Sequence, residues 1–330
     1  MANFENVMLS KSLYNVAGSS FTNELEKMDP SVNYEGTPLA SMDAFERQLK
    51  RFDIKVSGAN SDMVEKFFKS TESATLFPEY VARAIKQGID ENNVLPDITA
   101  AVTRVNTRDY RTLTATDTGR TLGSITEGAE IPSTKIEPQS SLVSLNKYGR
   151  MIVSSYETIK FQRLDVLTVT LKQIGAFIAK SELKDAVTVL QTGVTAIDTA
   201  TSKTLAYADI ISLWSKFTDC TMNTMLVSTD MMPKLLALDE FKNPLTGIVL
   251  QGPGKVAAPM GCNVIRVDSL TSGTIIGLDK NYALEQIIAS DITLDNDRLI
   301  NMQMERATIT TIAGFAKIYP NAVQVLNLKA

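Results

Sequence analysis

The sequence feature that most constrains the fold is an apolar stripe of helical spacing from Arg163 to about Leu190. Its first members recur every three or four residues and so share one face of an α-helix: Leu164, Leu167, Leu171, Ile174 and Ile178. At 1.5 Å per residue this helix is roughly 40 Å long, beyond the three or four turns usual in globular proteins. We therefore predict a structural spine that ends at Gly193, because glycine suits the position after a helix.

Length and composition indicate a folded body with more than one lobe. The chain has 330 residues, of which 44% are apolar and 21% are charged. Because a domain takes roughly 100–200 residues, we expect two linked lobes with substantial cores. Strand patterns gather towards the C-terminus, over 263–267, 274–277, 282–288, 291–294, 301–313, 315–319 and 323–326. Together with the helices, they predict the α+β class.

Residues 1–75 are rich in Ser, Asn and charged side chains and are expected to form an arm. One short helical stripe, Met42 to Phe52, starts behind Ser41 as a candidate N-cap, and a second covers Val64 to Phe68. Each stripe is too short to hold a helix alone, so the arm needs a partner surface. A third helix is predicted over Pro78–Gln87, with Gly88 ending it.

From Tyr110 to Tyr156, β-branched residues alternate with polar ones around a centre rich in Gly and Pro. This pattern predicts a long β-hairpin whose arms cannot both be buried in a core. After a linker over 194–204, a second lobe is predicted to start with a helix over Tyr207–Phe217, with Trp214 on its apolar face. A strand at Thr224–Val227 and a helix capped by Ser228 or Thr229 follow, and then a Gly/Pro-rich loop over 239–262.

Composition and motifs disfavour the common enzyme classes. The chain has no His, which removes the commonest general base and zinc ligand. Cys220 and Cys262 lack the paired spacing of metal or redox motifs and are expected as core residues. Glu127 and Glu130 have no catalytic partner and are expected as surface charges. We predict no catalytic, cofactor-binding or metal-binding residues.

Two further classes of interaction are disfavoured. A formal net charge of −4 provides no global attraction for nucleic acid phosphates, so strong direct binding to nucleic acid is not expected. No run approaches the roughly 18 apolar residues of a membrane span, so no membrane partner is expected.

Several strings in a fixed order resemble the tailed-bacteriophage major capsid family, whose fold is named for phage Hong Kong 97. They are "FPEYVARAI" at Phe77–Ile85, "EGAEIP" at Glu127–Pro132, "KYGRMIVSSYE" at Lys147–Glu157, "LQTG" at Leu190–Gly193 and the tail over Met304–Leu326. No single string is diagnostic, but their order extends over roughly residues 75–328. The N-terminal arm alone lies outside the resemblance.

The resemblance implies a division of the chain into named parts. They are an arm at 1–75, a first P-domain part at 76–111, an E-loop hairpin at 112–147, a P-domain part with the spine helix at 148–198, an A-domain at 199–290 and a P-domain return at 291–330. It also implies two sets of contact residues. Candidates between subunits are Arg120, Glu127, Glu130, Lys135, Lys147 and Arg150, and candidates at the capsomer axis are Gly252, Pro253, Gly254 and Lys255.

The function implied is a shell of hexamers and pentamers in the virion capsid, assembled in the host bacterial cytoplasm. The expected partners are other copies of the chain, a portal protein, scaffold or decoration proteins, and double-stranded DNA bound without sequence specificity. Two alternatives remain open. An encapsulin-type nanocompartment shares the fold and would enclose a cargo protein, whereas a soluble α+β enzyme would show turnover as a monomer or dimer.

Overall fold

The computed structural model describes residues 4–16, 19–117, 124, 126–128, 134–155, 161–242, 261–299 and 304–329. Contacts between distant parts of the chain divide it into two compact units. Unit 1 comprises Met1–Asn92, Gly149–Ala179 and Ile292–Thr311. Unit 2 comprises Asn93–Tyr148, Lys180–Asp291 and Ile312–Ala330. The chain thus passes between the units several times.

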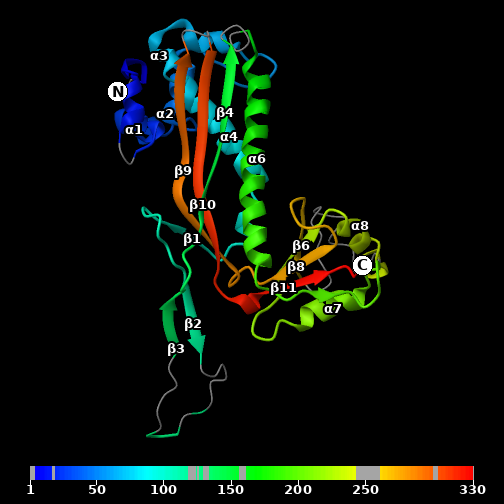
Figure 1. Cartoon of the computed structure of the whole chain (residues 1–330). Coiled ribbons are helices and arrows are strands. Elements are labelled where there is room, and N and C mark those ends of the chain that lie inside the picture. Colours follow the sequence, from blue (N-terminus) through cyan, green and yellow to red (C-terminus); the bar gives the residue numbers. More distant parts are fainter. Residues whose placement is uncertain are drawn as a thin grey trace. The chain divides into compact units, whose positions relative to one another are not determined.

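Helices and strands are mixed along the chain, which confirms the α+β class (Figure 1). The helices are α1 (Phe21–Met28), α2 (Ala44–Arg51), α3 (Thr71–Ala74), α4 (Phe77–Asn92), α6 (Leu164–Gln191), α7 (Tyr207–Ser215), α8 (Met231–Leu236) and α9 (Asp239–Lys242). The strands are β1 (Ala101–Arg104), β2 (Leu113–Asp117), β3 (Thr134–Pro138), β4 (Leu145–Ser155), β5 (Ile197–Asp198), β6 (Thr224–Ser228), β7 (Asn263–Val267), β8 (Thr274–Leu278), β9 (Leu284–Leu299), β10 (Met304–Lys317) and β11 (Val323–Asn327).

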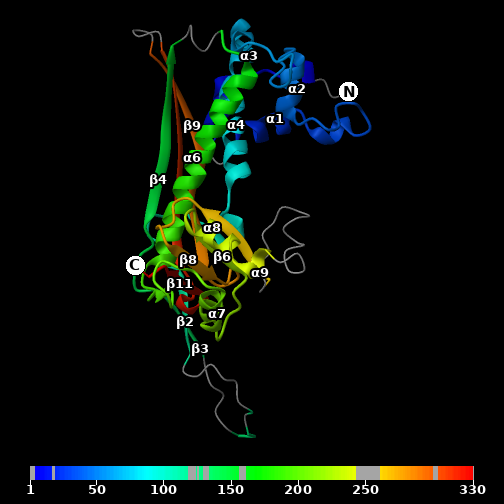
Figure 2. The ribbon, with the colours of Figure 1, turned by 90° about the vertical axis from the view of Figure 1, so that its right-hand side faces the viewer.

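The predicted spine helix is confirmed as α6, which has 28 residues and ends before Gly193. Gly193 has φ +73°, the left-handed conformation that glycine adopts without a Cβ clash. Residues up to Ala179 belong to unit 1, and Lys180 onwards belong to unit 2. In unit 1, Figure 2 shows α6 between the strands β4, β9 and β10 on one side and α4 on the other.

Helix α4 is longer than predicted, because Gly88 lies inside it and does not end it. A Cβ at Gly88 would lie 2.2 Å from the carbonyl oxygen of Lys172 in α6, and one at Gly175 would lie 2.2 Å from that of Ile85 in α4. The two glycines therefore allow the two helix backbones to approach more closely than any side chain permits. The prediction erred because glycine serves both helix ends and close helix contacts.

The predicted arm packs inside unit 1. Phe45 and Leu49 of α2 are buried in one core with Phe67 and with Ile85 of α4, so the apolar stripes find their partner surface within the same chain. The prediction of Ser41 as N-cap was wrong. Helix α2 begins after Asp43, whose carboxylate accepts the Glu46 amide while the Glu46 side chain accepts the Asp43 amide. This reciprocal pair satisfies two amides that one serine could not.

A buried charged cluster fixes the connection between α1 and α2. The guanidinium of Arg47 is fully buried, and its Nε donates to Asp29 Oδ2 at 2.7 Å. The hydroxyl of Tyr34 donates to the other oxygen of Asp29 at 2.6 Å, and the Arg47 guanidinium lies 4.3 Å from the Tyr34 ring centroid. Because each charge has a partner, burial does not leave an unpaired ion.

The region predicted as one long hairpin is divided between two sheets. Strands β2 and β3 form a separate two-stranded antiparallel sheet, with Leu113 opposite Pro138 and Ala115 opposite Ile136. The second predicted arm continues into β4, which lies at the edge of a four-stranded sheet of order β1-β9-β10-β4. The prediction was wrong because alternation identifies strands and not their partners.

Unit 2 contains a five-stranded sheet of order β5-β11-β8-β6-β7 that is covered on both faces. Leu226 and Ile276 pack into one core with Val187 of α6, whereas Val227 and Ile275 pack into another with α7 and α8. The predicted strands at 224–227, 263–267 and 274–277 are confirmed. The two strands predicted at 282–288 and 291–294 are one strand, β9. Likewise, the two strands predicted at 301–313 and 315–319 are one strand, β10.

Three predictions about side chains in unit 2 differ in outcome. Cys262 is buried and Cys220 packs against a core, as expected. Trp214 was predicted on the buried face of α7, but its side chain is 46% exposed, while Leu213 is fully buried. The N-cap predicted at Ser228 or Thr229 was also wrong, because α8 begins after Asp230.

Candidate functional site

The two-stranded sheet β2–β3 carries an uncovered apolar face. Directly opposite residues of an antiparallel pair share a face, and side chains alternate along each strand. Leu113, Ile136 and Pro138 therefore lie on one face, and Glu137 lies on the other. Leu113 is 57% exposed and Ile136 is 68% exposed. No described residue of unit 2 covers these two side chains fully, so the hairpin presents apolar surface to water.

Several residues predicted to contact neighbouring subunits are exposed. Glu127 lies in a turn with Gly128, which has φ +84°. Lys147 and Arg150 are exposed on β4, and within unit 1 the Arg150 guanidinium lies 5.8 Å from the ring centroid of Phe177 on α6. The structure therefore places Lys147 and Arg150 on a different sheet from the hairpin.

The other predicted contact residues lie wholly or partly outside the described residues. Lys135 is described only through its backbone, which pairs with Thr116. Arg120 and Glu130 lie outside the described residues, and so do the predicted axis residues Gly252, Pro253, Gly254 and Lys255. Their roles stay predictions.

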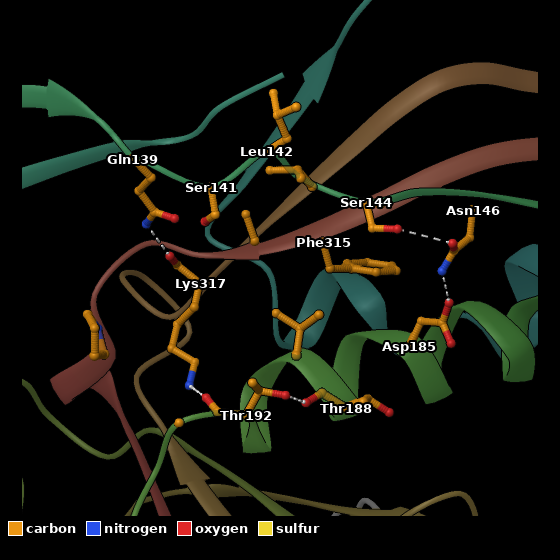
Figure 3. A pocket seen from close by; sticks show the side chains of 16 residues that line it. Gln139, Ser141, Leu142, Ser144, Asn146, Asp185, Thr188, Thr192, Phe315 and Lys317 are labelled. Atoms are coloured by element: carbon orange, nitrogen blue, oxygen red, sulfur yellow. Dashed lines mark hydrogen bonds between the residues drawn. The ribbon is translucent and has the colours of Figure 1, made fainter. Parts of the chain in front are cut away.

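A pocket of about 670 Å³ lies in unit 2 between the loop after β3, the last turns of α6 and the end of β10. Figure 3 shows hydrogen bonds among the polar residues at its rim, some to backbone carbonyl oxygens and some between side chains. Lys317 Nζ donates to the carbonyl oxygen of Thr192 at 2.8 Å, and Gln139 Nε2 donates to that of Lys317 at 2.9 Å. At the other end, Asn146 Nδ2 donates to Asp185 Oδ2 at 2.5 Å. These bonds attach the loop to the helix and strand.

Three ionisable groups near this pocket have shifted pKa values, and burial, which disfavours the charged form, is the main cause in each. Burial lowers the pKa of the Lys317 amine to about 8 and raises the pKa of the Glu182 carboxyl to about 7. The Tyr148 hydroxyl donates to Asp185, and burial with this carboxylate raises its pKa above the ordinary value.

The described residues offer no other reactive centre. The Cys262 thiol donates to the carbonyl oxygen of Met222 at 3.0 Å, and burial raises its pKa to about 11, so it stays protonated. Within the described ranges, no group of three or more Cys, Asp or Glu side chains could hold a metal ion. No helix in the described part of the chain is long and apolar enough to cross a bilayer.

Known protein structures resemble this fold at low sequence identity. The capsid of a native GTA particle aligns with a TM-score of 0.55 at 13% identity, covering 74% of this chain and 91% of that chain. Gordonia phage Cozz aligns at 0.54 and 18% identity, covering 72% and 87%. A virus-like particle from Pyrococcus furiosus aligns at 0.52 and 12% identity, covering 76% and 98%. At such identities these similarities establish the fold.

The family is established by the sequence. A family model described as "Phage capsid protein" matches residues 138–312, which is more than half of the chain. The match includes β4, α6, the five-stranded sheet of unit 2 as far as β8, all of β9 and most of β10. No curated protein sequence matches the chain. The chain therefore belongs to the phage capsid protein family, as a major capsid protein with the Hong Kong 97-type fold.

Proposed function

We propose that copies of the chain assemble into hexamers and pentamers of an icosahedral shell that encloses double-stranded DNA. The family and the fold support a shell subunit. The single observation that carries the proposal is the apolar face of the β2–β3 hairpin. Leu113 and Ile136 remain exposed on it, although every other strand pair with a described register lies in a larger sheet.

An isolated two-stranded sheet is marginally stable in water, because two strands bury too little apolar surface to offset the cost of ordering them. The hairpin therefore gains stability when its Leu113 and Ile136 face is covered. A second copy of the chain is the partner available in every shell position. One hairpin contact per copy is modest, but repetition around a closed shell makes the assembly far more stable than any pair.

Charged residues are proposed to set the register of this contact. Glu127, Lys147 and Arg150 are exposed, and Arg120, Glu130 and Lys135 are proposed to act with them across interfaces. Charge complementarity at an interface selects partner and register more than it adds affinity. The loop with Gly252, Pro253, Gly254 and Lys255 is proposed to lie at the capsomer axis, within an A-domain at 199–290.

The resemblance to phage capsid proteins supports the remaining parts of the proposal. The chain catalyses no reaction, assembles in the host bacterial cytoplasm and meets a portal protein, with scaffold or decoration proteins as further partners. The encapsulin-type alternative shares the fold and would enclose a protein. The match to a family of phage capsid proteins favours a DNA container.

Negative-stain electron microscopy of the purified full-length chain tests the proposal. We expect closed particles of uniform diameter, together with capsomers in size-exclusion chromatography. Production in cells that carry the complete set of particle genes should give particles whose contents are DNA and not one cargo protein. A chain that stays monomeric at high concentration under every salt condition would contradict the proposal.

A further inference from the structure

The chain that enters the hairpin is attached to unit 2 by one buried carboxylate. Glu285 belongs to β9, and only 5% of its surface is exposed. Its carboxylate accepts hydrogen bonds from three hydroxyl groups: Thr103 of β1, Tyr110, which donates at 2.7 Å, and Thr112. Thr112 is itself buried and directly precedes β2. Two of the three donors therefore lie where the hairpin begins.

The same two residues also attach the chain that leaves the hairpin. The backbone amide of Gln139 donates to the carbonyl oxygen of Thr112 at 2.8 Å, and that of Val143 donates to the carbonyl oxygen of Tyr110 at 2.9 Å. Gln139 directly follows β3. Glu285 thus fixes the first arm through hydroxyl groups and, through the backbone of the first, contributes to fixing the second arm, whose Gln139 side chain also bonds to Lys317.

The chemistry of this contact is directional. No Lys or Arg forms an ion pair with Glu285 within the part of the chain that the structure describes. Its stabilisation comes from hydroxyl donors, whose geometry is narrower than that of a simple charge contact. Burial, together with the hydrogen bond to Glu285, raises the pKa of the Tyr110 hydroxyl, so this group stays a donor. If apolar side chains replaced Glu285 and its donors, they would fill the space but would not fix the direction of the hairpin.

We propose that Glu285 is a positioning residue for assembly, which fixes the direction in which the β2–β3 hairpin extends from the rest of unit 2. This inference rests on the proposed function of the hairpin. From Thr112 to Asp117 the arm extends for about 17 Å at 3.3 Å per residue. A rotation of about 10° at Thr112 therefore moves Asp117 by about 3 Å, which exceeds the roughly 0.5 Å to which a binding surface must be held.

Hydrogen exchange measured by mass spectrometry on the full-length chain, with particle counts on the same samples, tests the inference. Glu285→Ala removes the acceptor for all three hydroxyl groups. We expect amides in 106–113 and 139–143 to exchange at least about tenfold faster, while amides of β6 and β8 exchange as before. Closed shells should fall in number, and irregular particles should replace them. Glu285→Gln keeps one acceptor oxygen and should recover most of the shells.

Asp279→Ala is the matched control. Asp279 is a buried carboxylate of the same unit that accepts the Asn223 side-chain amide at 2.7 Å and the Thr221 backbone amide at 3.0 Å. Among the described residues, no hydrogen bond of its carboxylate involves the hairpin. This variant should lower the melting temperature without selective exchange in 106–113. If Glu285→Ala also loosens β6 and β8, the single variants Tyr110→Phe and Thr112→Val must show the selective exchange.

The outcomes separate the two proposals. Absence of shells from the unmodified chain contradicts the proposed function. Normal shells and unchanged exchange at 106–113 in Glu285→Ala, from a chain that otherwise forms shells, contradict the positioning role. The same follows if Tyr110→Phe and Thr112→Val both assemble normally and show no selective exchange.

Discussion

Replacement of the two exposed aliphatic residues of the hairpin should raise the concentration needed for shell assembly. Full burial of a Leu or Ile side chain contributes about 1.5–3 kcal/mol. Leu113 is 57% and Ile136 is 68% exposed, so covering what remains should contribute about 2–4 kcal/mol per hairpin contact. With one such contact per copy, Leu113→Ser/Ile136→Ser should raise the critical concentration for assembly by roughly 30- to 1000-fold.

Light scattering against protein concentration measures the change in critical concentration. A melting curve on unassembled protein measures the stability of the single chain. The melting temperature should change little, because the replaced side chains already face water in the single chain. Val32→Ser is the control, since Val32 is 73% exposed in unit 1 and far from the hairpin in sequence. Equal critical concentrations for the double variant and the control would refute the reasoning. A large drop in melting temperature would mean that the face packs within the chain.

Three further predictions concern the interior. Gly88→Ala should lower the unfolding free energy by about 1–3 kcal/mol in chemical denaturation, because the added Cβ meets the Lys172 backbone. This loss is expected although alanine favours helices more than glycine does, and unchanged stability would refute the close contact. Arg47→Met should lower it by about 3–5 kcal/mol by leaving Asp29 buried without its cation, and Arg47→Met/Asp29→Asn should recover part of the loss. Burial raises the pKa of Glu182 from 4.5 to about 7, so the folded chain binds this proton more tightly than the unfolded chain. The unfolding free energy should therefore fall as pH rises from about 4.5 to 7, and Glu182→Gln should remove that fall. Parallel pH profiles of the unfolding free energy for the variant and the unmodified chain would contradict this prediction.

The sequence predicted the elements whose patterns are local. The stripe from Leu164 to Leu190 specifies α6, and short apolar runs specify β6, β7 and β8, because each pattern is complete within one segment. The resemblance added the fold, and the family match confirmed it. Strand partners were not predictable in this way. β4 follows β3 closely in sequence yet joins β10 in another sheet, a choice made by tertiary packing.

The candidate site was predicted only in part. Charged residues such as Glu127 were singled out because charges are easy to recognise in a sequence, whereas the apolar face of Leu113 and Ile136 depends on the register between two strands. Glu285 was not found at all. Its three donors precede it by more than 170 residues, and an isolated Glu in a strand pattern gives no signal of a buried acceptor.

That separation in the chain also orders events during synthesis. A ribosome that adds about 5–20 residues each second completes Glu285 roughly 9–35 s after Thr112. For most of this interval the residues of the hairpin have been synthesised, but the carboxylate that fixes its direction has not. Nascent chains are therefore poor partners for one another, although many of them crowd along one messenger RNA. Competence to assemble arises only when the chain is almost finished, which protects a self-associating protein from polymerising while it is still being made.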